Sequence, residues 1–238
     1  MLSINFLLIS SFKTFDQYHL LWLMLLGLLG YLMYRQYFRF SKYQKRKFLK
    51  FLAWLIVLLE VIKDLVLLWE GKFIVGDLPF HLCGISIFLC LYESYRHTEF
   101  SKELVYTLTL SGALLALLFP SWTNIAPFGL RSAQSFIIHF ALVLYAVLVF
   151  KDKSFKLHYY NMFKMMLFVG LLAILIHYFN LAFATNFMFL ETYSANSPLE
   201  YLALILPFVP YFFKMIGLMF IGILLMYLPL ILRHKKRR

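Results

Sequence analysis

Long apolar stretches separated by short polar segments run along the whole chain. Each stretch has roughly the 20 residues that a helix needs to cross a bilayer. The pattern therefore predicts an all-α membrane helix bundle with about seven transmembrane helices, forming a single domain over residues 1–238. The expected spans are residues 18–34, 51–70, 79–95, 103–119, 131–150, 165–183 and 201–232. Because Pro207 and Pro210 interrupt the last stretch, it forms either one span or a re-entrant segment followed by one span.

Basic residues are concentrated in every second connection between these stretches. The connections rich in Lys and Arg are residues 35–50, 96–102, 151–164 and 233–238. The connections that alternate with them contain few or none: residues 71–78, 120–127 and 185–200. Since basic connections stay on the cytoplasmic side, we expect the amino terminus outside and the carboxyl terminus in the cytoplasm of a cell-membrane protein.

Composition excludes an ordinary soluble domain. Hydrophobic residues make up 63% of the chain and charged residues 14%, with a mean hydropathy of +0.79, whereas soluble domains are about half apolar and a quarter charged. The bilayer is therefore the expected partner. The net charge of +12 lies in short runs beside apolar stretches, which argues against nucleic acid. Oligomeric state does not follow from the sequence.

The segment from Leu78 to Ser86 places an imidazole and a thiol at the start of an apolar helix. Asp77 is a suitable helix cap and Pro79 suits a first helical turn, so we expect the helix to begin at Pro79. Cys83 then lies about one turn in, near the partly positive helix end. His81 and Cys83 are about 200° apart around the helix, so a base for Cys83 must come from elsewhere. Cys90 is on the same helix, about 10 Å away and beyond disulfide reach, so both thiols should be free.

Polar residues gather at one depth on four expected spans, in the half that the topology places in the outer leaflet. They are Asp64, His81, Cys83, Arg131, Gln134, Ser135, His139, His177 and Asn180, with Thr185 and Asn186 just beyond. Since intramembrane polar groups usually serve function, this pattern predicts a polar cavity in the outer leaflet. The cytoplasmic halves of the spans read as mostly apolar, which argues against a continuous pore. Glu60, Lys63 and Asp64 should form an internal ion-pair cluster.

Each polar residue also has a simpler interpretation. Cys83 fits a small buried core residue, and His139 fits a hydrogen bond to a neighbouring helix. Arg131 fits a side chain reaching for lipid phosphate at the membrane boundary, and His177 fits helix packing. The histidines have no metal-binding spacing, so neither a metal nor another cofactor is expected.

Four short segments carry a resemblance to a known family. They are Leu78–Cys83, Gly112–Pro120, Arg131–His139 and Asn186–Leu190. In order and spacing they resemble the YwaF-like bacterial membrane proteins, which are related to the transmembrane protein 164 family of eukaryotes. The eukaryotic relatives are phospholipid acyltransferases with a Cys–His pair, so the resemblance implies that Cys83 is the nucleophile and His139 its base. The family's histidine before the glutamine is missing here, where the chain reads Pro127-Phe128-Gly129-Leu130-Arg131.

Two functions compete. The first is a membrane phospholipid acyltransferase or transacylase, in which Cys83 and His139 act on a phospholipid or lysolipid through a thioester. Its expected substrate-binding residues are His81, Arg131, Gln134, His177, Asn180 and Asn186. The second is a transporter or lipid-binding protein without catalysis, which the broken last stretch would suit.

Overall fold

The computed structural model describes residues 11–151, 155–194 and 197–235, and this part of the chain is helical without strands. The helices are α1 (Gln17–Arg39), α2 (Lys42–Trp69), α3 (Leu82–Arg96), α4 (Glu99–Leu104), α5 (Leu110–Leu118), α6 (Leu130–Phe150), α7 (Tyr159–Phe183), α8 (Leu199–Leu204) and α9 (Tyr211–Lys235). A π-helical turn, Val105–Thr109, joins α4 to α5. Residues 236–238, the end of the expected basic carboxyl terminus, lie outside the described part.

Five helical segments are long and apolar enough to cross a membrane: α1, α4 to α5, α6, α7 and α9. The protein is therefore a multi-pass membrane protein. Expected spans 51–70 and 79–95 do form helices, but neither meets the same standard. Charged Glu60, Lys63 and Asp64 interrupt the apolar sequence of α2, and α3 is only 15 residues long.

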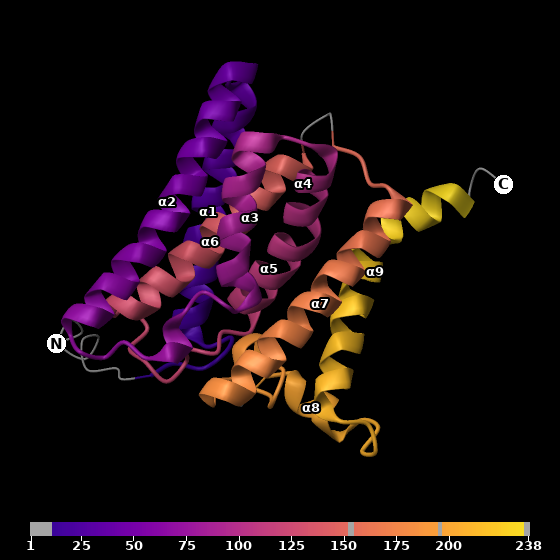
Figure 1. Cartoon of the computed structure of the whole chain (residues 1–238). Helices are drawn as coiled ribbons and strands as arrows, with labels where there is room; N and C mark the ends of the chain where they lie inside the picture. The colour runs from indigo at the N-terminus through magenta and orange to yellow at the C-terminus, as the bar shows by residue number, and fades with distance from the viewer. Residues whose placement is uncertain (1–10, 152–154, 195–196, 236–238) are drawn as a thin grey trace.

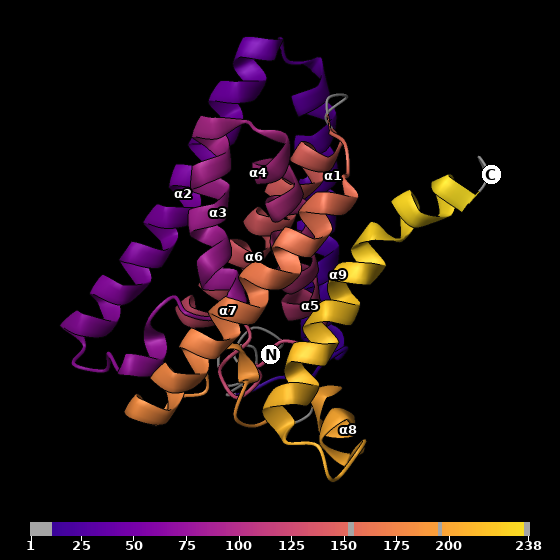
Figure 2. The same cartoon turned by 45° about the vertical axis from the view of Figure 1, so that its right-hand side comes forward.

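Helix α6 is the centre of the larger of two helical groups (Figure 1). It packs against α1, α2, α3 and α5, and its side chains Phe136, Tyr145 and Leu148 are fully buried. Helices α7 and α9 pair with each other and lie to one side of this group (Figure 2). The bundle thus has a five-helix body, made of α1, α2, α3, the continuous segment α4 to α5, and α6, and a two-helix flank, made of α7 and α9.

Helix α3 begins at Leu82, three residues later than expected. Asp77 does not cap it, because its carboxylate accepts the Ile74 N–H at 3.0 Å within the preceding turn. The backbone of Pro79 instead folds over the helix start. A Cβ on Gly84 would lie 2.5 Å from the Pro79 carbonyl oxygen, so only glycine permits this approach. Cys83 is consequently the second residue of α3 rather than a turn inside it.

The last apolar stretch is divided. Short helix α8 ends at Leu204. The helical path is interrupted at Leu206, which adopts a φ of 52°, and α9 begins at Tyr211. Of the two alternatives for residues 201–232, the structure thus has two helical pieces rather than one continuous helix.

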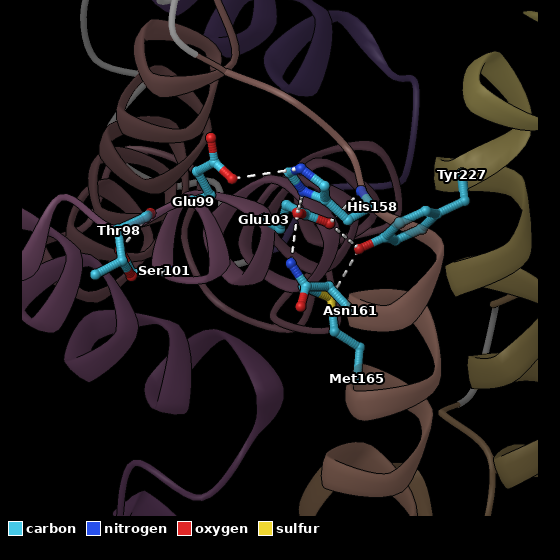
Figure 3. A network of polar contacts seen from close by, with 8 residues as sticks. All are labelled: Thr98, Glu99, Ser101, Glu103, His158, Asn161, Met165 and Tyr227. Carbon is cyan, nitrogen blue, oxygen red and sulfur yellow. Dashed lines mark hydrogen bonds and ion pairs between the residues drawn. The ribbon is translucent and has the colours of Figure 1, made fainter.

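Two buried carboxylates lie at the end of the bundle remote from Cys83, within half-spans that the sequence predicts to be mostly apolar. Glu93 accepts a hydrogen bond from Tyr145 at 2.6 Å. Glu103 is fully buried and contacts His158 at 2.8 Å, Asn161 at 2.7 Å and the Tyr227 hydroxyl (Figure 3). The Glu103 network ties α4 to α7 and α9. We call this side of the bundle the Glu103 end, and the opposite side the Cys83 end.

The expected ion-pair cluster on α2 is confirmed. The Lys63 ammonium lies 2.6 Å from the Glu60 carboxylate and 3.2 Å from that of Asp64. It also donates a hydrogen bond to the Asp77 carbonyl at 3.2 Å. The cluster therefore pairs the Lys63 charge with two carboxylates and fastens α2 to the turn that leads into α3.

Candidate functional site

A cavity of about 470 Å³ lies between the five-helix body and the α7–α9 flank at the Cys83 end. Its polar lining consists of His81, Cys83, Ser111, Ser121, Trp122, Ser194 and Ser197. Its apolar lining comes mainly from α5 and α9. None of the described lining residues is an acid, a lysine or an arginine. The cavity therefore suits a ligand that is uncharged along most of its length.

Cys83 reaches the cavity wall because two glycines let backbone segments approach it. Gly84 accommodates the Pro79 backbone, and Gly112 brings α5 so close that a Cβ there would lie 3.8 Å from the Cys83 sulfur. The first backbone hydrogen bond of α3 joins the Ile85 N–H to the His81 carbonyl. The amides of residues 82–84 thus precede the helical ladder, and such a helix start stabilises negative charge.

His139 on α6 is held in one tautomer. Its Nδ1 lies 2.7 Å from the Ser135 carbonyl oxygen, which only accepts hydrogen bonds, so Nδ1 carries the proton. Nε2 of the neutral ring therefore keeps its lone pair, as a general base requires. The ring stacks on Trp122, with centroids 4.9 Å apart. Because Trp122 lines the cavity, His139 lies directly behind the cavity wall.

Cys83 and His139 come from neighbouring helices. Cys83 packs against a core cluster that includes Ile138 and Leu142, which flank His139 along α6. Within the described part of the chain, no direct hydrogen bond joins the thiol to the imidazole. Catalytic contacts are often long in the absence of substrate and tighten when it binds.

His81 is oriented by a backbone contact. The Met188 N–H donates to its Nδ1 at 3.1 Å, so the proton of the neutral ring is on Nε2. The ring also packs edgewise on Phe187, with centroids 5.2 Å apart. His81 thus offers a hydrogen-bond donor at the cavity wall, whereas His139 offers an acceptor behind it.

Three expected substrate-binding residues hold together the loop after α7 instead of lining the cavity. Asn180 accepts the Phe187 N–H at 2.8 Å and donates to its carbonyl at 3.1 Å. His177 lies 2.9 Å from the Glu191 carboxylate, and Asn186 accepts the Glu191 N–H at 3.0 Å. The loop they stabilise supplies Met188 and Phe189 to the cavity wall.

The other expected binding residues lie at the start of α6. Arg131 is exposed and Gln134 is half-buried; neither lines the cavity. Trp122, by contrast, was missed by sequence reasoning. Its only signal was a large aromatic side chain in a short polar connection.

The sequence matches the TMEM164 family over residues 11–228. The chain belongs to the TMEM164 family. This confirms the relationship read from the motifs, while the narrower YwaF-like assignment stays a prediction. No curated protein and no solved structure matches the chain.

In this TMEM164-family chain, the four motif segments meet at the Cys83 end. Leu78–Cys83 supplies the thiol, and Gly112–Pro120 forms the opposite wall. Arg131–His139 carries the imidazole, and Asn186–Leu190 contributes the Met188 contact to His81. Segments that are far apart in the sequence thus build one site.

Proposed function

We propose that this TMEM164-family protein moves acyl chains between membrane lipids, with Cys83 as nucleophile and His139 as general base. The observation that carries the proposal is a thiol on the wall of a largely apolar cavity between membrane helices, near an imidazole whose Nε2 is free to accept a proton. A soluble acyl donor is not needed, because phospholipid reaches such a cavity from the bilayer.

The proposed topology has seven crossings, with α2 and α3 added to the five apolar segments, the amino terminus outside and the carboxyl terminus inside. Helix α2 has 28 residues, enough to cross a bilayer, and Lys63 is neutralised by its own acidic neighbours. This topology places the Cys83 end in the outer leaflet of the cell membrane, where a phospholipid or lysolipid would enter.

In the first half-reaction, Nε2 of His139 accepts the Cys83 proton, directly or through one water molecule. The thiolate adds to the ester carbonyl of a phospholipid and forms a tetrahedral intermediate. When this collapses, the carbon–oxygen bond to the glycerol breaks and the leaving oxygen takes the proton from His139. The products are a thioester on Cys83 and a lysolipid.

In the second half-reaction, an acceptor lysolipid hydroxyl gives its proton to His139 and attacks the thioester. The carbon–sulfur bond breaks, and the departing thiolate takes the proton back, which regenerates Cys83. Both half-reactions pass through an oxyanion. The Cys83 and Gly84 amides at the start of α3 and the Nε2–H of His81 would donate hydrogen bonds to it.

The remaining expected residues have supporting roles in this proposal. Exposed Arg131 and half-buried Gln134 would meet the lipid head group beside the cavity mouth, where a guanidinium suits phosphate. His177, Asn180 and Asn186 would act through the loop that they hold against His81.

The experiment is transacylation in vesicles that contain a labelled phospholipid and an unlabelled lysophospholipid. Cys83→Ser should abolish label transfer, because serine is a far weaker nucleophile at neutral pH. Cys90→Ser is the matched control, since Cys90 is on the same helix and fully buried but does not line the cavity. His139→Gln should slow transfer by about 100-fold or more. Equal activity of Cys83→Ser and wild type would overturn the proposal.

A lipid carrier is the second candidate, favoured by the interruption of the helix between α8 and α9. A carrier needs access from both sides of the membrane, whereas the Glu103 network ties α4, α7 and α9 together at the far end of the bundle (Figure 3). Movement of labelled lipid between leaflets that is retained in Cys83→Ser would support the carrier.

A further inference from the structure

The cavity extends from Cys83 as a cleft lined by residues of α5 and α9. The residues of α5 that line it follow the spacing of one helix face, and so do Met215, Leu218, Met219, Gly222 and Leu225 of α9. On α9 the lining runs from Met215 to Leu225, about 15 Å along the helix axis. Leu115 on α5 and Leu225 on α9 are 58% and 62% exposed, so the cleft opens sideways on the surface that faces the bilayer.

The polarity of the lining changes along the cleft. The serines Ser121, Ser194 and Ser197 come from connections at the Cys83 end, whereas the α9 portion is wholly apolar. Cys83 lies beside the apolar α9 portion, because its neighbour Leu82 packs against the same hydrophobic cluster as Met219. A lipid with its ester at Cys83 would therefore direct its head group to the serines and its chain along α9.

The structure assigns this cleft to the acyl chain of the lipid that reacts at Cys83, and Gly222 as the residue whose missing side chain keeps the cleft open to that chain. The inference rests on the proposed function and names its chain-binding site. A Cβ on Gly222 would meet no atom within 4 Å, although Gly222 lines the cavity. The space that a side chain would occupy at position 222 is therefore empty and belongs to the cleft.

The position of Gly222 makes it suited to this role. It lies three residues beyond Met219, about 4.5 Å further from the level of Cys83. Farther along α9, Tyr227 is fully buried and its hydroxyl contacts Glu103. A chain that runs from the thiol towards the Glu103 end thus passes Gly222.

Gly217 is a matched control on the same helix. A Cβ there also meets no atom within 4 Å, but Gly217 does not line the cavity. Either glycine can be replaced without a clash, and a larger residue should favour the helix. Gly222→Phe and Gly217→Phe therefore differ in whether the ring enters the cleft.

The test offers the purified protein phosphatidylglycerol vesicles with equal amounts of lauroyl, palmitoyl and stearoyl chains, and measures the acyl groups found on Cys83. In Gly222→Phe the rate at which Cys83 is acylated should fall about tenfold or more for all three chains, since the ring blocks the path of each chain and two methylenes left unburied already weaken binding about tenfold. Gly217→Phe should keep the wild-type rate. An unchanged rate in Gly222→Phe would overturn the inference.

A second measurement separates this inference from the proposed reaction. Phosphatidylcholine with a photoreactive diazirine in mid-chain is cross-linked to the Cys83→Ala protein, which cannot acylate. Cross-links should fall on peptides of α5 and α9 and be lost when Gly222→Phe is added. If they do so while wild type forms no thioester, the chain site stands and the reaction fails. If cross-links fall elsewhere, or persist with Gly222→Phe, the chain site is refuted even where acylation occurs.

Discussion

Replacing Gly84 with alanine tests how the turn before α3 positions the thiol. The added Cβ would lie 2.5 to 2.7 Å from the carbonyl oxygen, carbonyl carbon and Cα of Pro79. These are backbone atoms, so no side-chain rotation relieves the contact. Overpacking of this kind costs about 1–3 kcal/mol, and the better helix propensity of alanine returns at most about 1 kcal/mol. We therefore expect a net loss of about 1–2 kcal/mol.

The assay is thermal unfolding of the detergent-solubilised protein, together with the rate at which maleimide alkylates Cys83. Gly84→Ala should unfold at lower temperature and change the alkylation rate, because the start of α3 must shift. Gly217→Ala is the control, since a Cβ there meets nothing within 4 Å, and it should equal or exceed wild-type stability. If Gly84→Ala were as stable as Gly217→Ala and its alkylation rate unchanged, the Pro79 contact would not be as described.

Three further changes probe other parts of the molecule. Tyr227→Phe removes a hydrogen bond to a buried carboxylate and should lower the free energy of unfolding by about 1.5–3 kcal/mol, measured by thermal unfolding. Tyr178→Phe, at a residue 68% exposed, should stay within about 0.5 kcal/mol of wild type. Equal effects of the two changes would contradict the Glu103 network. Trp122→Phe should keep a ring against the His139 imidazole and most of the proposed transacylation, whereas Trp122→Ala should lose this activity; similar rates for both variants would exclude a positioning role. Arg131→Lys should raise KM for the phospholipid with little change in kcat, and an equal fall of kcat and kcat/KM would instead place the guanidinium in the transition state.

The helices could be predicted from the sequence because their apolar stretches are continuous and their separators are polar. Helix starts that are determined by tertiary contacts could not be predicted in this way. Asp77 and Pro79 carry ordinary start signals, but the Pro79 backbone packs on Gly84 and delays α3. That contact depends on a folded turn, and residue types alone do not reveal it.

Only part of the site could be predicted from the sequence, because the other part depends on contacts between distant residues. Ser135 and His139 share a helix face, and their contact is local. The partners of Glu103, by contrast, are 55 to 124 residues away in the sequence. The sequence around Glu103 therefore does not indicate that its carboxylate is buried. Trp122 was missed because its stacking partner lies on another element.

The most direct test of the central claim is whether Cys83 carries an acyl group. The purified protein is incubated with vesicles of a single phosphatidylglycerol, and its intact mass and cysteine-containing peptides are then measured. The account predicts one added acyl group on the Cys83 peptide, removed by neutral hydroxylamine as a thioester is, and none on the Cys90 peptide. It also predicts slow formation of this adduct in His139→Gln. An unmodified Cys83 under conditions in which wild type transfers acyl chains between lipids would contradict the account.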